Sequence, residues 1–210
     1  MITAHIFGTP RTSPHSPAWE SLSSLSGFCD LIVVHDYGMK KCLSEIVDEF
    51  SRIKRMVVVD TSEPVPLARM ADDEWIYFGV LDEVVHEDSH HYLWDLAHHY
   101  DEFEGADVPI RMVFGACSTK DVVETRMVRR SAAEKMFFDG EVFSTSLDVS
   151  KCSPSGHLPS PVWKFTWAFP GDPSMVEYEV RAGAFTNIQG LPRCVRRLVG
   201  RYAYQPPYMK

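Results

Sequence analysis

The feature that most constrains the fold of this chain is an alternation of apolar runs and amphipathic segments over about its first eighty residues. Four runs have the continuous apolar centre of strands that are covered on both faces. They lie at residues 2–7, 30–36, 55–60 and 75–81. Segments with apolar residues at helical spacing separate them, at residues 17–26, 40–50 and 66–72. This alternation predicts an α/β fold with a doubly wound, mostly parallel sheet.

The rest of the chain predicts one more helix, several strands and a final helix. These elements are expected at residues 89–103 (a helix with Ser89 as N-cap), 108–116, 124–130 and 135–145 (strands or a hairpin), 162–169 and 176–185 (an antiparallel hairpin), and 191–204 (a helix). A Ser- and Pro-rich stretch reads as a loop before the hairpin. We therefore expect a main domain over residues 1–145 and a small C-terminal extension over residues 146–210, packed on the same domain.

Acidic residues follow three of the predicted strands, at Asp36, Asp60 and the pair Asp82–Glu83. In an open α/β sheet, ligands bind beside the carboxyl ends of the strands. Mg²⁺ and Mn²⁺ prefer oxygen ligands and commonly bind one or two carboxylates together with substrate phosphates. A lone Asp-Glu pair is more typical of a solvated strand end, but the acids that recur at the other strand ends favour Asp82 with Glu83 as a candidate metal site.

The order and spacing of several short segments carry a family resemblance. The segments are "ITAHIFGTPR", "SLSSLSGF", "LIVVHD", "PLARMA", "VLDEVVHED", "RMVRR" and "FFDGEVF". Over residues 1 to about 145, this succession resembles the nucleotide-sugar-binding fold of GT-A glycosyltransferases, in the style of glycosyltransferase family 2. The resemblance implies an enzyme that moves a sugar from a nucleotide-diphosphate donor to a hydroxyl acceptor, with Mn²⁺ or Mg²⁺ bound.

The resemblance also implies roles for particular residues. Asp82 matches the last aspartate of a DxD-type motif, which binds the metal that holds the donor diphosphate, and Glu83 is the residue directly after it. The remaining matches are Asp36 for contact with the nucleoside, Arg69 for the base or diphosphate, and Thr9, Pro10 and Arg11 for the loop that covers the nucleotide.

Two positions depart from the family pattern. Val80 stands where the first aspartate of the DxD motif would be. The family's histidine after the aromatic-glycine element falls near Val142 and Phe143, which neither coordinate a metal nor accept a proton. Metal dependence therefore rests on Asp82, and the resemblance supplies neither the usual third ligand nor the usual base at these positions.

Sugar transfer itself requires a cation and, when configuration inverts, a base. Negative charge grows on the leaving diphosphate, and a metal or a cationic side chain must stabilise it. The cationic candidates are Arg69, Arg129 and Arg130. His86 and Glu87, with the neighbouring Asp88, are base candidates by position, and each has an alternative role as a solvated loop or cap residue.

The predicted C-terminal helix carries an arginine stripe. Arg193, Arg197 and Arg201 recur at intervals of four residues, with Arg196 beside them. Such a stripe fits a solvated surface helix, or else contacts to phosphate on the donor or on a nucleic-acid acceptor such as a modified DNA base. The histidine pairs at 90–91 and 98–99 predict only a polar helix face, because two turns separate them.

Charge and cysteine content limit the other classes of function. A net charge of −8 argues against general wrapping of nucleic acid or of an anionic membrane. Five cysteines without CxxC spacing argue against a disulfide scaffold, and they fit a reducing, cytoplasmic location. We expect no signal peptide and no membrane span. Two alternatives to a glycosyltransferase stay open: a catalytically inert GT-A-like binding protein and a metal-dependent phosphoesterase.

Overall fold

The computed structural model describes residues 1–8, 17–36, 50, 56–60, 74–114, 118–138, 143–154, 158–165 and 192–193. Several predicted elements lie outside these ranges. They are the helix at 66–72, nearly all of the helices at 40–50 and 191–204, and the hairpin strand at 176–185.

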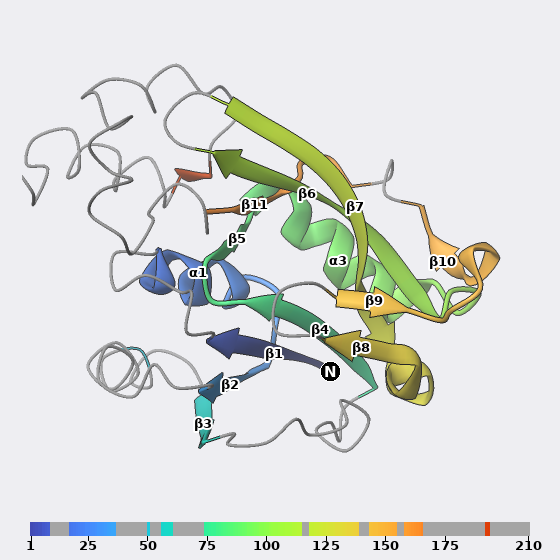
Figure 1. Ribbon diagram of the computed structural model, residues 1–210. Coiled ribbons are helices and arrows are strands. Elements are labelled where there is room, and N and C mark those ends of the chain that lie inside the picture. The colour runs from blue at the N-terminus through green and yellow to red at the C-terminus, as the bar shows by residue number, and fades with distance from the viewer. Residues whose placement is uncertain are drawn as a thin grey trace, which may run out of the picture.

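Four parallel strands form the first part of the sheet (Figure 1). They are β1 (Ile2–Gly8), β2 (Leu31–Asp36), β3 (Met56–Asp60) and β4 (Trp75–Val80), in the order β3-β2-β1-β4. Their bounds agree with the predicted runs to within a residue or so. The α/β prediction with a mostly parallel sheet is thereby confirmed.

The second part of the sheet is mixed. β7 (Ser118–Arg129) pairs with β4 antiparallel and forms a long hairpin with β6 (Gly105–Phe114). β11 (Val162–Lys164) runs parallel to β6 on one side and antiparallel to β5 (Glu83–Val85) on the other. β10 (Cys152–Ser153) also pairs with β6. The sequence did not predict β5, and β11 pairs here with β5 and β6.

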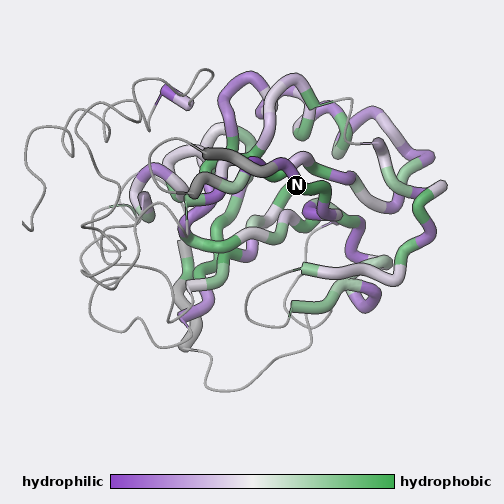
Figure 2. The backbone as a smooth tube through the Cα atoms, turned by 45° about the horizontal axis from the view of Figure 1, so that its top comes forward, coloured by the Kyte–Doolittle hydropathy of each residue, from purple (hydrophilic) through white to green (hydrophobic). Residues whose placement is uncertain are grey.

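Different elements cover the two faces of the sheet. On one face, α1 (Ala18–Leu25) and α3 (Glu87–His99) pack on alternate residues of β1, among them Ile2 and Ile6. On the other face, Phe7 and Phe78 pack against the 3₁₀ helix η2 (Arg130–Lys135) and the hairpin of β8 (Met136–Phe138) and β9 (Phe143–Thr145). Another short 3₁₀ turn, η3, spans Val149–Lys151. This alternation follows from the two-residue period of a strand, and Figure 2 shows hydrophobic segments running through the middle of the molecule.

Both described helices begin at residues other than those predicted. α1 begins at Ala18 with Pro17 as its N-cap. α3 begins at Glu87, and its N-cap is His86 rather than Ser89, because the His86 Nδ1 accepts the Asp88 N–H at 3.1 Å. The Ser89 hydroxyl instead donates to the Ser160 carbonyl at 2.7 Å and so links α3 to the segment before β11.

Gly27, just after the end of α1, lies in close contact with α3. A Cβ placed on Gly27 would overlap the His90 imidazole. The glycine therefore permits the end of α1 to pack directly on α3.

Within the ranges that the structure describes, no helix is both long and apolar enough to span a bilayer.

Candidate functional site

The carboxyl ends of the parallel strands lie along one edge of the sheet. In the register of these strands, Gly8 lies opposite Asp36, and Phe7 lies opposite both His35 and Val80. The chain then turns at Leu81, whose N–H donates to the Phe7 carbonyl at 3.0 Å. Asp36 and the turn that carries Asp82 therefore sit at the same edge, where ligands of α/β sheets bind.

The turn from β4 into β5 places Asp82 at the margin of the core. Asp82 is buried, and its carbonyl accepts the N–H of Phe165 at 3.0 Å. Val80, two residues earlier, points into the hydrophobic cluster that contains Phe7 and Phe78. Val80, which the resemblance matches to the first aspartate of a DxD motif, therefore occupies a core position in this chain, where an apolar residue is favoured.

Glu83 lies in a buried cluster of charges. One carboxylate oxygen accepts a hydrogen bond from Arg126 Nη2 at 2.6 Å and lies 3.5 Å from Lys164 Nζ. The other oxygen accepts the Val80 N–H at 3.2 Å. Arg126 also contacts Glu124 at 2.9 Å. The contacts of Glu83 itself join it to residues of β4, β7 and β11.

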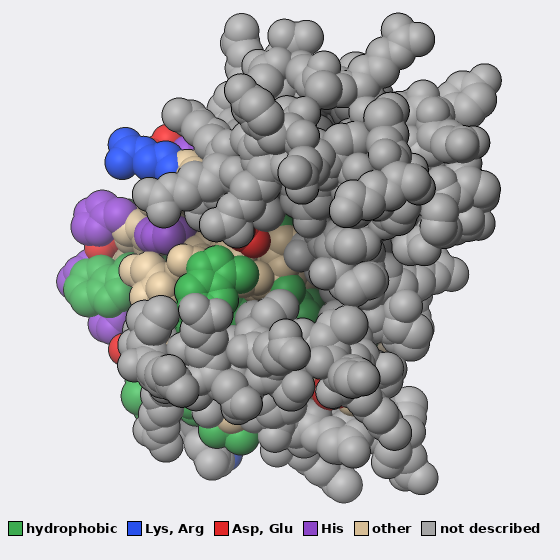
Figure 3. Space-filling model, turned by 90° about the vertical axis from the view of Figure 1, so that its left-hand side faces the viewer, with side chains coloured by type: hydrophobic (Ala, Val, Ile, Leu, Met, Phe, Trp, Pro, Cys, Tyr) green, Lys and Arg blue, Asp and Glu red, His purple; other side chains and the backbone are tan. Residues whose placement is uncertain are grey.

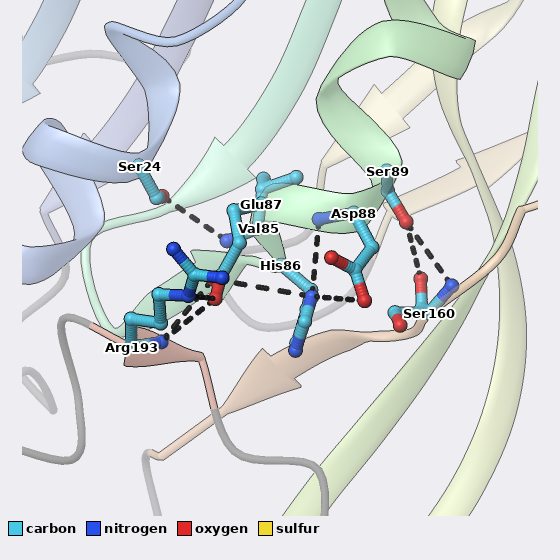
Figure 4. Close-up of polar contacts among 8 residues, drawn as sticks. All are labelled: Ser24, Val85, His86, Glu87, Asp88, Ser89, Ser160 and Arg193. Atoms are coloured by element: carbon cyan, nitrogen blue, oxygen red, sulfur yellow. Dashed lines mark hydrogen bonds and ion pairs between the residues drawn. The ribbon is translucent and has the colours of Figure 1, made fainter.

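The acidic segment after β5 forms the first turn of α3 (Figure 4). Glu87 points toward Arg193, and both of its carboxylate oxygens accept the Arg193 backbone N–H at 3.2 Å. The Arg193 Nε lies 3.4 Å from the same carboxylate. Glu87 therefore connects the start of α3 to the point where the predicted arginine helix begins.

Charge and hydrogen bonding control the ionisation of this turn. Partial burial alone would raise the pKa of Glu87, but its own N–H, the Arg193 N–H and the neighbouring positive charges lower the pKa below its ordinary value. His86 uses Nδ1 as the acceptor of its cap hydrogen bond, so in its neutral form it carries the proton on Nε2. The lowered pKa of Glu87 makes it an anion at neutral pH.

Arg129 and Arg130 lie at the opposite edge of the sheet. Arg129 pairs in register with Trp75, at the start of β4, and its guanidinium lies 4.6 Å from the centre of the Trp75 ring. The guanidinium donates to Glu74, to Asp101 and to the carbonyls of Tyr100 and Phe103. The Arg130 N–H donates to the Glu74 carbonyl. Because these two arginines are remote from Asp82, we leave them out of the proposed site.

Other sequence candidates lie outside the described residues. They are Thr9, Pro10, Arg11, Arg69, Arg196, Arg197 and Arg201.

His91, His98 and His99 lie on the exposed side of α3, whereas His90 packs against Gly27 and Phe28 at the end of α1. Figure 3 shows histidine side chains gathered at one margin of the molecule. His91 lies 3.2 Å from Asp95, and His98 stacks on Trp94 with 4.1 Å between ring centroids. Among the described side chains, no group of three or more His, Cys, Asp or Glu residues is placed to hold a metal ion.

Buried polar residues that the sequence pattern did not indicate lie close to this edge. Arg126 and Lys164 are charged residues inside strands, and both are buried. His5 and His35 are buried side by side, with His5 Nδ1 2.9 Å from His35 Nε2. Burial lowers the pKa of both, to about 3 and about 4 respectively, and the proximity of His35 adds to the effect on His5.

Comparison with solved structures identifies the fold. The first 349 residues of TarS from S. aureus match with a TM-score of 0.50 and 15% identity, covering 78% of this chain and 60% of TarS. The same protein in complex with UDP matches with a TM-score of 0.50 and 14% identity, with the same coverage. In complex with UDP-GlcNAc it matches with a TM-score of 0.50 and 13% identity, covering 96% of this chain and 66% of TarS. The chain has a GT-A-like α/β fold.

These likenesses concern the fold alone, since the identities are low. The chain spans about 60% of the length of the TarS fragment that it matches. No protein-family model matches the sequence, and a search of curated protein sequences found no match.

Proposed function

We propose that this protein is a glycosyltransferase that moves a sugar from a nucleotide-diphosphate donor to a hydroxyl acceptor. One observation carries the proposal: Asp36 and the Asp82 turn lie together at the carboxyl-end edge of a GT-A-like sheet. The fold that this sheet resembles has been solved with UDP and with UDP-GlcNAc in TarS. A uridine-diphosphate sugar is therefore the first donor to test.

Asp82 is the residue that we propose for the divalent cation. Mg²⁺ and Mn²⁺ sites are commonly completed by substrate phosphates around one or two carboxylates. The single carboxylate of Asp82, with Val80 in the core two residues earlier, fits a cation that arrives together with the donor diphosphate. When bound, such a cation would offset the negative charge that develops on the leaving diphosphate. Asp36, at the end of β2, is proposed to contact the nucleoside.

The contacts of the candidate residues limit which of them can act as the base. His86 holds its Nδ1 in the cap of α3, and Glu83 has both oxygens engaged by an N–H and two cations. Glu87 also has both oxygens engaged, by the Arg193 N–H, but its side chain is 30% exposed whereas that of Glu83 is 2% exposed, so an acceptor hydroxyl can reach Glu87. We propose Glu87 as the residue that accepts the proton of the acceptor hydroxyl.

The proposal is tested by calorimetry of UDP and UDP-GlcNAc binding with and without Mn²⁺. We expect binding that requires Mn²⁺ and that weakens at least about tenfold, or ~1.4 kcal/mol, in Asp82→Asn. Asp95→Asn is the control, because this acid lies on the outer side of α3 and pairs with His91. Nucleotide binding that is indifferent to both substitutions and yields no turnover would favour an inert binding protein.

Product identity separates the remaining alternatives. Incubation with UDP-GlcNAc and Mn²⁺ should release UDP, with transfer of the sugar to an added acceptor. Release of UMP without transfer would favour a phosphoesterase.

Modified and unmodified DNA duplexes test the nucleic-acid acceptor, since phosphate contacts make such binding salt-sensitive. Gel shifts that show no salt-sensitive binding to either duplex would exclude a DNA acceptor.

A further inference from the structure

The sheet divides just before the Asp82 turn. β4 and β7 are paired at three positions, and the last joins Tyr77 to Met127. Beyond that pair β4 continues beside β1, whereas β5 crosses to the far end of the sheet and pairs with β11. Beyond Tyr77, the backbone N–H and C=O groups of β4 that point away from β1 therefore have no described strand beside them.

Two side chains supply hydrogen bonds where the strand pairing ends. Arg126 Nη1 donates to the Phe78 carbonyl at 3.4 Å, and the Glu83 carboxylate accepts the Val80 N–H at 3.2 Å. Buried backbone groups need such partners, since an unpaired one costs free energy comparable to a lost hydrogen bond. The end of β4 is thus held by the side chains of β5 and β7.

The same side chains belong to a balanced set of buried charges, which we call the buried quartet: Glu83, Glu124, Arg126 and Lys164. The side chains of Arg126 and Glu83 are 0% and 2% exposed, and their closest atoms are 2.6 Å apart. The Arg126 guanidinium also lies 4.3 Å from the centre of the Phe143 ring. Two cations and two carboxylates compensate one another, and removing a single member would leave an uncompensated charge in the interior.

The buried quartet fixes both sides of Asp82. On one side, the N–H of Val80 is bound by Glu83, which is itself the residue after Asp82. On the other side, the Asp82 carbonyl accepts the N–H of Phe165, the neighbour of Lys164. Asp82 is therefore carried by a short turn that is bonded on one side to the Glu83 carboxylate of β5 and on the other to the backbone N–H directly after β11.

We propose that Glu83, Arg126 and Lys164 are positioning residues, which set the geometry of the Asp82 turn and through it the affinity for the donor diphosphate. This inference rests on the proposed function for its ligand. It assigns Glu83 a role distinct from that of a catalytic residue, since its contacts are all with other parts of the sheet. Groups that orient a ligand-binding residue typically change affinity or activity by about 10- to 100-fold when they are substituted.

The chain offers a matched control at the other edge of the sheet. Glu104 also lies between two cations, 2.5 Å from Lys151 and 3.3 Å from Lys135. Its carbonyl accepts the Arg129 N–H, which places it near the start of β4, away from Asp82. Glu83→Gln and Glu104→Gln therefore each remove one charge from a carboxylate between two cations, in a buried triad at one end of the sheet and in a more exposed triad at the other.

The experiment compares Glu83→Gln and Lys164→Met with Glu104→Gln and Lys151→Met, at a temperature where each variant is folded by circular dichroism. Calorimetry gives the Kd for UDP in the presence of Mn²⁺, and amide hydrogen exchange follows residues 80–83 against the rest of the sheet. We expect the first pair to raise the Kd about tenfold or more and to accelerate exchange at the turn, and the control pair to do neither. If Glu83→Gln does not fold, the Kd and the exchange rates of Lys164→Met decide whether the inference holds.

The outcomes separate this inference from the proposed function. An unchanged Kd in the folded Glu83 and Lys164 variants would overturn the positioning role, even with faster exchange at the turn. If the wild-type protein binds no nucleotide, the proposed function fails, and hydrogen exchange alone then decides whether the buried quartet holds the turn. Equal exchange at residues 80–83 in wild type and variants would overturn the inference in that case.

Discussion

The histidine pair of β1 and β2 makes the stability of this protein depend on pH. His5 and His35 are buried and hydrogen-bonded to each other, and their pKa values are lowered to about 3 and about 4. Both therefore stay neutral in the folded protein at pH values where an unfolded histidine, with a pKa of about 6.5, takes up a proton. Stability contributed by the pair is complete above the unfolded pKa and is lost as the pH falls from there toward the folded values.

The size of the effect follows from these pKa values. At about pH 5, each histidine of the unfolded chain lies roughly 1.5 pH units below its pKa, and each unit corresponds to about 1.4 kcal/mol. The unfolded state therefore gains about 2 kcal/mol per histidine, or about 4 kcal/mol for the pair, relative to neutral pH. Other groups with shifted pKa values, among them Glu124, whose pKa is raised by burial, and His90, whose pKa is lowered by burial, are present in the wild type and in the control variant alike.

Urea denaturation near neutral pH and near pH 5 measures the loss. The control is His5→Asn with His35→Gln, which places amide groups near the positions of the Nδ1 and Nε2 atoms that meet in the wild type and removes both titrations. We expect the wild type to lose about 4 kcal/mol more than the double variant between the two pH values. Equal losses in the two proteins would refute the assignment of this pH dependence to the pair.

Three further predictions concern packing and hydrogen bonding. Gly27→Ala should lower the free energy of unfolding by about 1–3 kcal/mol in urea denaturation, because the added methyl group overlaps the His90 ring. Ser24→Ala should lower the free energy of unfolding by about 1–3 kcal/mol in the same assay, because the buried Val85 N–H loses the Ser24 hydroxyl that accepts it at 3.1 Å. A decrease below about 0.5 kcal/mol would show that this N–H finds another partner. Arg129→Met should lower the thermal midpoint but leave the Kd for UDP unchanged, since its ion pairs lie at the edge opposite Asp82.

The first four strands were predictable because each is a largely apolar run in the sequence, and β1 and β4 are buried along their whole length. β5 was not predictable, because its three residues follow closely on the apolar run of β4. Its partner, β11, also lies far along the chain. The start of α3 was misplaced because histidine is an uncommon N-cap, and the turn formed by His86 depends on an imidazole nitrogen that a sequence pattern does not orient.

The candidate site was predictable in part for similar reasons. The carboxyl ends of parallel strands meet at one edge, so Asp36 and Asp82 could be grouped from the order of the strands alone. The partners of Glu83 could not be predicted, because a charged residue inside a strand usually indicates a solvated face. Only the packed structure shows that Arg126 and Lys164 are turned inward. Likewise, the spacing of Arg129 in "RMVRR" does not reveal that its strand runs antiparallel to β4 and carries it to the far edge.

The crossing of β5 has a consequence for the order in which the protein folds. β5 follows β4 directly in the chain, yet it pairs with a strand that is synthesised much later, and beside that pair Ser89 meets Ser160 across 71 residues. Contacts over such separations form slowly, because a long loop must close before they contribute. The parallel strands that carry Asp36 can assemble earlier, during synthesis, whereas the turn that carries Asp82 reaches its final form only when β11 is in place. A nascent chain that ends before β11 would therefore hold half of the proposed site.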